Sequence, residues 1–201
     1  MSFWSRGRRS KDADQAPIPA APISTRLAVV ELWGPSQRTL VGMDLSLSRL
    51  IDLVNRDDAI SVVPLDERFE DLSELIEMRA DQSWTSVDVE DTLLIVPPPQ
   101  ATNPQRRLHR PRQPVEILVG RFAISGMVHV PPGAQAAGFL FRQNVRYAAV
   151  TRAVVRDTEL EGFEQHADVV LVNMHRIDSI HDVGLDQVET PAAAEPIAPS
   201  A

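Results

Sequence analysis

The chain has 201 residues, a formal net charge of −8 and no cysteine. This length suits one large domain or two small ones. Without cysteine, disulfides, thiolate zinc sites and cysteine nucleophiles are excluded, and a cytoplasmic location is favoured. No apolar run has the length of a membrane-spanning helix, and the arginines near the start are not followed by the apolar segment of a secretory signal. We therefore expect a cytoplasmic protein without a membrane span.

Residues 1–25 predict a disordered leader, because they mix Ser, Arg, Asp, Ala and Pro without apolar periodicity. The first residues combine two aromatic side chains with three arginines. Such a tip is typical of segments that fill a partner's pocket or touch an anionic membrane surface, and a terminus that binds nothing is the alternative. The residues of this possible partner-binding tip are Phe3, Trp4, Arg6, Arg8 and Arg9.

Residues 26–96 predict a first small β domain. The extended runs "RLAVVELW" and "RTLVGMDLSL" flank the turn sequence "GPSQ" and indicate a hairpin. Leu50, Leu53 and Val54 then follow at helical spacing, so "SRLIDLVNR" predicts a short helix that crosses to the strand "AISVVPL". The segment "FEDLSELIEMRADQ" repeats that spacing and predicts a second helix, and "VDVEDTLLIV" predicts the closing strand or strand pair.

Residues 97–113 predict a stiff, extended linker, because prolines fix φ and lack a backbone donor. Four arginines surround His109 in this segment. They are candidates for contact with nucleic-acid phosphates or with the acidic surface of residues 26–96, but without interleaved aromatic side chains such contact with nucleic acid is weak and salt-sensitive. The four arginines are Arg106, Arg107, Arg110 and Arg112.

Residues 114–180 predict a second small β domain with the same order of elements. "VEILV" and "FAISGMVHV" indicate a hairpin, "GAQAAGFLFRQN" a short helix, and "RYAAVTRAVV" and "VVLVNMHRIDSI" the later strands, with "RDTELEGFEQHAD" as a hairpin loop. Residues 181–201 predict a disordered tail. The predicted fold is mainly β, with a minor α+β character: two tandem small, strongly bent β-sheets or SH3-like or Sm-like barrels, each with a short helix.

The register of this tandem repeat depends on which pattern is matched. Placing Gly42 and Met43 on Gly126 and Met127 puts the apolar residues on opposite faces of the two strands. Because a strand enforces alternation strictly, we prefer an alignment shifted by one residue. Two unrelated small β domains are the alternative. The apolar face is formed in the first unit by Val41, Met43, Leu45 and Leu47, and in the second by Ile124, Gly126, Val128 and Val130.

Arg49, Asp52 and Asn55 stand three residues apart in "RLIDLVN", and the second unit closes with "VVLVNMHRI", which contains Asn173. These segments resemble an uncharacterised bacterial domain family with the pattern Arg-Leu-Ser-Asp-Leu-Leu-Asn after a hairpin and a closing strand of the form Val-x-Val-Asn-x-x-x-Ile. The resemblance implies no known catalytic activity. On physical grounds, Arg49 and Asp52 predict an ion pair on one helical face, and Asn55 predicts a left-handed end of the helix.

The histidines and acidic residues give only weak indications of chemistry. "HRIDSIHD" places four metal-ligand types close together, but only as a local cluster, and we predict no metal site. An oriented base from His166 and Asp168 lacks a serine in a nucleophile-elbow context. The carboxylates of residues 57–71 lack calcium-loop spacing and predict a solvated acidic face. The four residues of the local cluster are His175, Asp178, His181 and Asp182.

These patterns favour a non-enzymatic protein-interaction scaffold or adaptor, which binds protein partners or its own copies and has no cofactor and no catalytic residues. The alternative is a nucleic-acid-binding or regulatory protein that uses Sm-like barrels and the arginine-rich linker. A third hypothesis is an enzyme with a site between the two units that uses His166 or His175.

Overall fold

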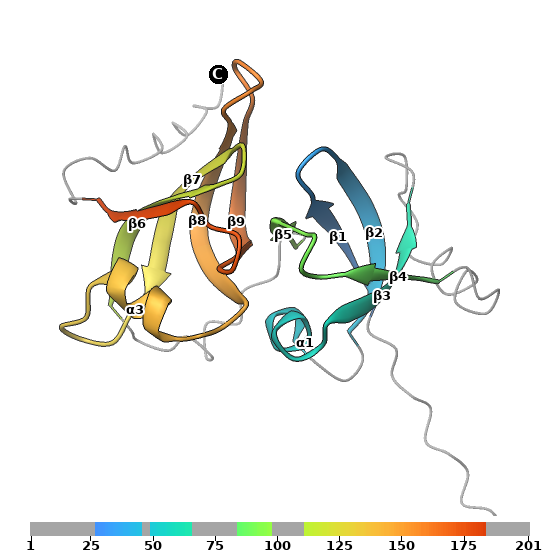
Figure 1. The fold of residues 1–201 in the computed structure, drawn as a ribbon, viewed down its shortest axis with the longest axis horizontal. Helices are drawn as coiled ribbons and strands as arrows, with labels where there is room; N and C mark the ends of the chain where they lie inside the picture. Colours follow the sequence, from blue (N-terminus) through green and yellow to red (C-terminus); the bar gives the residue numbers. More distant parts are fainter. Residues whose placement is uncertain (1–26, 46–48, 66–83, 98–110, 184–201) are drawn as a thin grey trace, which may run out of the picture.

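The computed structural model describes residues 27–45, 49–65, 84–97 and 111–183. Their strands form one ten-stranded sheet in the order β10-β6-β7-β8-β9-β5-β1-β2-β3-β4, and every neighbouring pair is antiparallel (Figure 1). The described helices are both seven residues long, and neither is long and apolar enough to cross a membrane. The predicted mainly β class is confirmed.

The N-terminal half, residues 27–97, carries five strands of this sheet and one described helix. The turn between the first two strands is closed by a hydrogen bond from Gly34 N to Gln37 O (2.8 Å), as the "GPSQ" segment predicts. The helix links the second strand to the third. The elements are β1 (Leu27–Trp33), β2 (Arg38–Asp44), α1 (Leu50–Arg56), β3 (Ala59–Pro64), β4 (Thr85–Asp88) and β5 (Leu94–Val96).

The C-terminal half, residues 111–183, repeats this order with longer strands. Gly120, at φ 54°, makes the tight turn of its first hairpin, and Gly162, at φ 77°, lies in the hairpin loop predicted between the later strands. The first strand begins within the predicted linker, at Arg112. The elements are β6 (Arg112–Val119), β7 (Phe122–His129), α3 (Ala136–Arg142), β8 (Tyr147–Asp157), β9 (Glu164–Asn173) and β10 (Ser179–Asp182).

Strand order and pairing correspond between the two halves. In one half the order is β5-β1-β2-β3-β4, and in the other it is β10-β6-β7-β8-β9. The pair Val30↔Val41 corresponds to Val115↔Gly126, and the pair Leu32↔Ile95 corresponds to Ile117↔Ile180. This correspondence is the alignment shifted by one residue, which alternation favoured over the shared Gly-Met dipeptide.

Two hydrophobic cores lie on opposite faces of the central strands. Leu94 and Val96 of β5 pack into the core of the C-terminal half, whereas Ile95 between them packs into the core of the N-terminal half. Leu171 of β9 likewise points into the N-terminal core, away from its strand neighbours. Because adjacent residues of a strand point to opposite faces, one continuous sheet serves both cores.

The arrangement differs from the expected pair of separate sheets or barrels. The described strands join into a single sheet that stays open, with β10 and β4 as its two edges. The sequence predicts a strand order that occurs twice, but it does not predict that an edge strand of one half pairs with an edge strand of the other. The predicted second helix and most of the predicted leader, linker and tail lie outside the described residues.

Candidate functional site at the junction of the two halves

The junction between the halves is centred on the pairing of β5 with β9. Leu94 pairs with Val172 and Ile95 with Leu171, and the N–H of Asn173 donates to Leu93 O at 2.9 Å. Figure 1 shows β5 between the two halves, next to β9. Ladder hydrogen bonds and apolar side chains therefore hold the halves together along the same strands.

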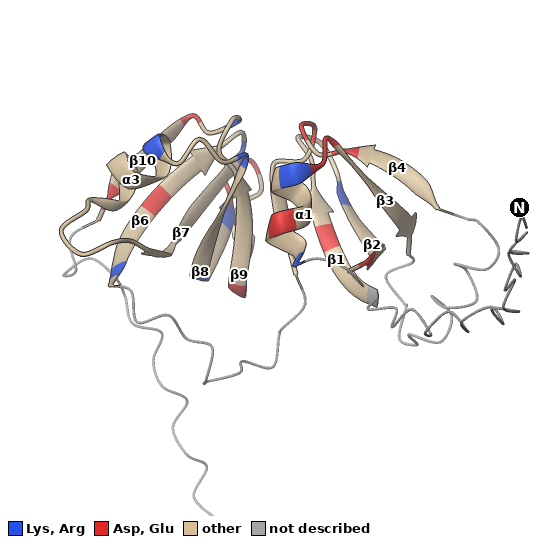
Figure 2. Ribbon diagram, turned by 90° about the horizontal axis from the view of Figure 1, so that it is seen from below, with Lys and Arg blue, Asp and Glu red and all other residues tan. Residues whose placement is uncertain are grey.

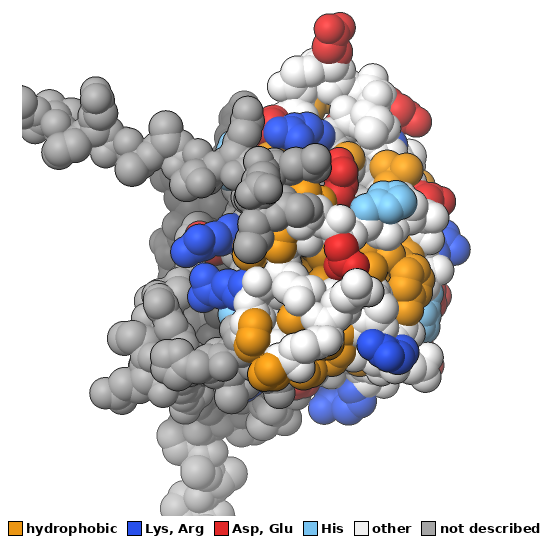
Figure 3. Space-filling model, turned by 90° about the vertical axis from the view of Figure 1, so that its left-hand side faces the viewer, with side chains coloured by type: hydrophobic (Ala, Val, Ile, Leu, Met, Phe, Trp, Pro, Cys, Tyr) orange, Lys and Arg blue, Asp and Glu red, His pale blue; other side chains and the backbone are white. Residues whose placement is uncertain are grey.

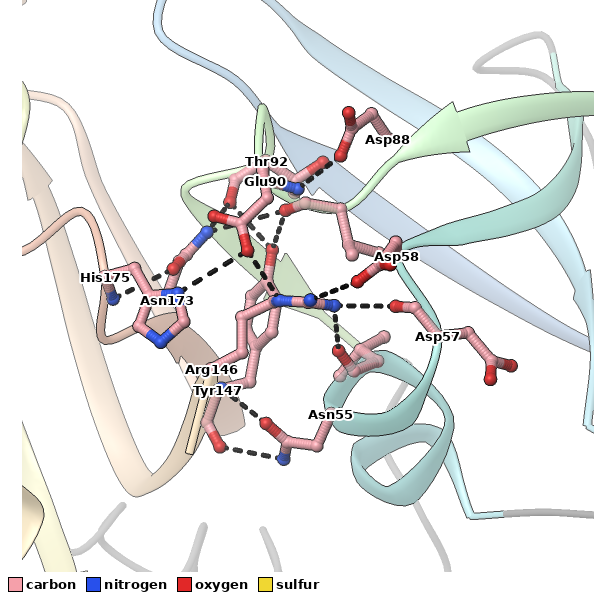
Figure 4. Close-up of polar contacts among 12 residues, drawn as sticks. Asn55, Asp57, Asp58, Asp88, Glu90, Thr92, Arg146, Tyr147, Asn173 and His175 are labelled. Carbon is pink, nitrogen blue, oxygen red and sulfur yellow. Dashed lines mark hydrogen bonds and ion pairs between the residues drawn. The ribbon is translucent and has the colours of Figure 1, made fainter. Parts of the chain in front are cut away.

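Tyr147 crosses this junction from the start of β8 into the core of the N-terminal half. Its side chain is fully buried, and its hydroxyl lies 2.8 Å from Val89 O and 2.7 Å from Thr92 O (Figure 4). Burial raises the pKa of the Tyr147 hydroxyl well above its ordinary value, because the phenolate would lose its hydration. The side chain is therefore a neutral donor that secures the loop between β4 and β5.

Asn55 contacts the same residue from the opposite side. Its amide Nδ2 donates to Tyr147 O at 3.0 Å, and its Oδ1 accepts from Tyr147 N at 2.7 Å. A primary amide carries both a donor and an acceptor, so one side chain satisfies both main-chain groups where β8 begins. Figure 4 shows Asn55 at the end of α1 facing this strand.

Asn173 makes a matching contact from the end of β9. It is fully buried, and its Nδ2 donates to Thr92 O at 3.0 Å, while its Oδ1 accepts from His175 N at 3.1 Å. Thr92 O thus receives both the Tyr147 hydroxyl and the Asn173 amide. Asn55 and Asn173 are the two asparagines of the segments on which the predicted family resemblance rests. Both therefore form hydrogen bonds at the junction.

Arg146 supplies the charged part of the junction, with 14% of its side chain exposed. Its guanidinium donates to Asp57 O at 2.7 Å and pairs with Asp58. Glu90 Oε1 lies 2.7 Å from Arg146 Nε and forms an ion pair with it, but the angles are not those of a hydrogen bond. The hydrogen bond to Asp58 and the nearby charge of Glu90 raise the pKa of Arg146 against the effect of burial. His175 Nδ1 lies 3.5 Å from the same Glu90 oxygen.

Trp33 anchors another part of the junction. Its fully buried ring lies in the C-terminal core, 5.2 Å from the ring of Phe122 and 5.9 Å from that of Phe163 between centroids. The guanidinium of Arg38 covers the Trp33 ring at 4.0 Å and donates to Gln165 Oε1 at 2.7 Å. Trp33 of the N-terminal half thus packs into the C-terminal core, and Tyr147 of the C-terminal half packs into the N-terminal core.

Comparisons with protein-family models, curated proteins and solved structures found no significant match. The family resemblance therefore stays a prediction. What the geometry shows is a junction at which polar side chains of each half form hydrogen bonds with main-chain groups of the other half.

The segment "RLIDLVN" around α1 differs from the predicted ion pair and helix end in two details. Arg49 precedes the helix, its carbonyl accepts from Leu53 N at 3.0 Å, and no ion pair joins it to Asp52 in the described structure. Asn55 lies inside the helix, and the capping residue Asp57 has an extended backbone. The Asn55 amide reaches across to β8 instead. A left-handed asparagine, Asn144 at φ 47°, does follow the other helix, α3.

The four residues of the predicted "HRIDSIHD" cluster are dispersed. Asp178 accepts from Gly120 N at 2.7 Å, and Asp182 accepts from Ala137 N at 3.0 Å at the start of α3. His175 points to the junction, and His181 is exposed on β10. Across residues 27–45, 49–65, 84–97 and 111–183, no group of His, Asp or Glu has a metal-binding arrangement.

Other candidates lie apart from the junction or outside the described residues. Arg112 is exposed at the start of β6, whereas Arg106, Arg107 and Arg110 fall in an undescribed segment, as does the whole aromatic–basic tip. His166 lies on β9 with its Nε2 2.9 Å from Glu164 Oε1, and is exposed. The sequence patterns do not predict the roles of Arg146, Tyr147 and Trp33. The one signal in the sequence is that Tyr147 is the single tyrosine of the chain.

The two edges of the sheet offer further candidate surfaces. On β4, Thr85, Ser86 and Asp88 are exposed, and on β10, His181 and Asp182 are exposed. Figure 2 shows acidic segments gathered in the loops near α1 and β4. Figure 3 views the end that carries α3 and β10, where hydrophobic side chains lie among charged and histidine side chains.

Proposed function

We propose that this chain is a non-enzymatic interaction protein, a scaffold or adaptor that binds extended segments of protein partners along the edges of its sheet. The observation that carries this proposal is the pair of edge strands, β4 and β10, at the two ends of one ten-stranded sheet. An edge strand presents unpaired N–H and C=O groups, which form a template for an added strand.

The junction supports this proposal by showing the same mode of binding inside the chain. There an edge of the N-terminal half, β5, pairs with an edge of the C-terminal half, β9, and side chains secure the pair from both sides. The matching strand orders further support a tandem duplication of one unit.

The main-chain direction on β4 indicates how an edge variant is designed. Val89 N donates to Asp58 O at 3.0 Å, and Ile60 pairs with Val87. Since bonded and non-bonded pairs alternate in an antiparallel ladder, the N–H and C=O of Ser86 point away from β3. Proline at this position removes an outward donor and leaves the ladder to β3 intact.

The test is affinity capture from the native cell with the full chain and the variants Ser86→Pro and Ser86→Thr. Capture of a specific partner that is lost with Ser86→Pro and kept with Ser86→Thr supports edge binding. Capture unchanged by Ser86→Pro but lost on deletion of residues 1–25 would assign binding to the aromatic–basic tip. Recovery of no protein, including the chain's own copies, would contradict the proposed function.

The nucleic-acid hypothesis rests on the linker arginines, of which the structure describes only Arg112. It predicts binding of single-stranded nucleic acid that falls steeply with salt. Neutral replacement of all four arginines, Arg106, Arg107, Arg110 and Arg112, should then abolish the binding.

A further inference from the structure

We propose that the partner of the β4 edge is the β10 edge of a second copy of this chain, so that copies join head to tail and extend one sheet. This inference rests on the proposed function and names the occupant of its edges. The structural basis is that the chain already contains one such joint, between β5 and β9, and that among the described strands β10 and β4, the same two kinds of edge, have no further strand paired to them.

β10 and β5 are equivalent strands of the two halves. β10 holds the place in its half that β5 holds in the other, since Ile180 pairs with Ile117 as Ile95 pairs with Leu32. The entry of these strands is also the same: Leu93 N donates to Trp33 O at 2.8 Å, and Asp178 N donates to Leu118 O at 2.8 Å.

The other partner in the joint is equivalent in the same way. β4 corresponds to β9, because Tyr147 and Ala59 are the first residues of β8 and β3 and pair with Asn173 and Asp88 respectively. The contact between β10 and β4 would therefore repeat the contact between β5 and β9. Each copy contributes one edge of each kind, so the association is heterologous and closes into a ring or grows as a filament.

The main-chain hydrogen-bonding groups of the two edge strands are also in matching phase. Transfer of the junction register, in which Ile95 pairs with Leu171, brings Ile180 of one copy opposite Ser86 of the next. The main chain of Ser86 points away from β3, and Val183 N donates to Pro114 O at 3.2 Å, which by alternation directs the main chain of Ile180 away from β6. The two residues brought together are thus both ready to bond outward.

Residues of opposite type also occupy the positions equivalent to the ion pair of the junction. At the junction Arg146 pairs with Glu90. The equivalent positions at the ends are Asp58, which precedes β3 as Arg146 precedes β8, and His175, which follows β9 as Glu90 follows β4. In the transferred joint, Asp58 of one copy would therefore lie near His175 of the next, with the acidic side chain on the β4 side of the joint. Within each copy Asp58 is paired with Arg146, and His175 Nδ1 lies 3.5 Å from Glu90 Oε1, so the two residues would meet as members of existing ion pairs.

The joint between copies is expected to be weaker than the junction within the chain. Leu94 and Val96, which are buried at the junction, correspond to Ser179 and His181 on β10. A short ladder with polar side chains buries less apolar surface than the β5–β9 junction does. Association between copies should therefore be reversible and concentration-dependent.

The decisive experiment uses single-cysteine variants of the full chain, which has no cysteine of its own. The transferred register places Thr85 opposite His181, and both side chains are exposed. Thr85→Cys protein is mixed with His181→Cys protein and oxidised gently. The expected result is a disulfide-linked dimer from the mixture and none from either variant alone. Thr85→Cys mixed with Glu116→Cys, one strand further from the edge, is the register control and should give none.

Analytical ultracentrifugation of the purified chain provides a second readout. We expect an average mass that rises with concentration and returns to the monomer value with Ser86→Pro but not with Ser86→Thr. A chain that stays monomeric and gives no cross-linked dimer, or Thr85→Cys protein that cross-links with itself, would overturn head-to-tail pairing. Capture of a different protein by a monomeric chain would leave the proposed function standing and refute only this inference.

Discussion

Asn55 binds both main-chain groups of Tyr147, with Nδ2 to O at 3.0 Å and N to Oδ1 at 2.7 Å. The amide lies near the end of α1, and the tyrosine begins β8 in the other half of the chain. This relationship makes the two halves mutually dependent. Asn55 of the N-terminal half holds the start of β8, and Tyr147 of β8 packs its ring into the N-terminal core.

The first prediction concerns the loss of this amide. Asn55→Ala leaves the N–H and the carbonyl of Tyr147 without their partner, so we expect a loss of about 2–3 kcal/mol in the free energy of unfolding. The matched control is Asp52→Ala on the exposed side of the same helix, which should change stability by less than about 0.5 kcal/mol. Urea denaturation followed by circular dichroism measures both. Equal effects of the two variants would contradict the assigned role of Asn55.

A second prediction follows from the single tyrosine of the chain. An unfolded tyrosine has a pKa of about 10, and burial raises the pKa of Tyr147 above this value. The stabilisation by the neutral hydroxyl is therefore complete below about pH 10 and is lost as the pH rises toward the folded pKa. We expect tyrosinate absorbance to appear only together with unfolding in an alkaline titration.

The variant Tyr147→Phe is the control for that titration. It removes the only tyrosine and one donor to Val89 O and Thr92 O, at a cost of about 1 kcal/mol near neutral pH. Its stability should depend less on pH above pH 10 than that of the natural chain. Tyrosinate absorbance in a fully folded natural chain would show that the hydroxyl is accessible, against the burial described above.

A third prediction addresses the coupling of the cores. Trp33→Ala removes a buried ring of the N-terminal half from the C-terminal core, so we expect a loss of about 3–5 kcal/mol. Because each core contains side chains of both halves, the variant should still unfold in one transition, at a lower denaturant midpoint. Circular dichroism and tryptophan fluorescence should report the same midpoint. Separate transitions of the two halves would show that the junction does not couple them.

The fourth prediction compares two glycines of the C-terminal half. A Cβ at Gly126 would lie 2.5 Å from Val150 Cγ1 and 3.0 Å from Thr151 O, so Gly126→Ala should destabilise the chain by about 1–3 kcal/mol. At Gly138, inside α3, the nearest atom is Arg142 Nη2 at 3.7 Å, and Gly138→Ala should stabilise by about 0.5–1 kcal/mol. Thermal unfolding shifts of opposite sign are the expected result.

Much of the fold followed from local patterns in the sequence. Alternation in "RTLVGMDLSL" and "FAISGMVHV" predicted strands β2 and β7 and their inward faces, where Met43 and Val128 are buried. The helical spacing of Leu50, Leu53 and Val54 predicted α1. Such patterns depend only on the geometry of one strand or one helix, so they can be read without knowing what packs against them.

The sequence by itself determined a mainly β chain with a strand order that occurs twice. Only the tertiary structure decided that the two halves share a sheet, because β5 and β9 meet from distant parts of the chain. The roles of Asn55, Tyr147 and Trp33 depend on this pairing. The sequence around each residue does not show whether its side chain faces solvent or the other half of the chain. Long-range pairing is set by the summed burial of many side chains, and no local spacing records it.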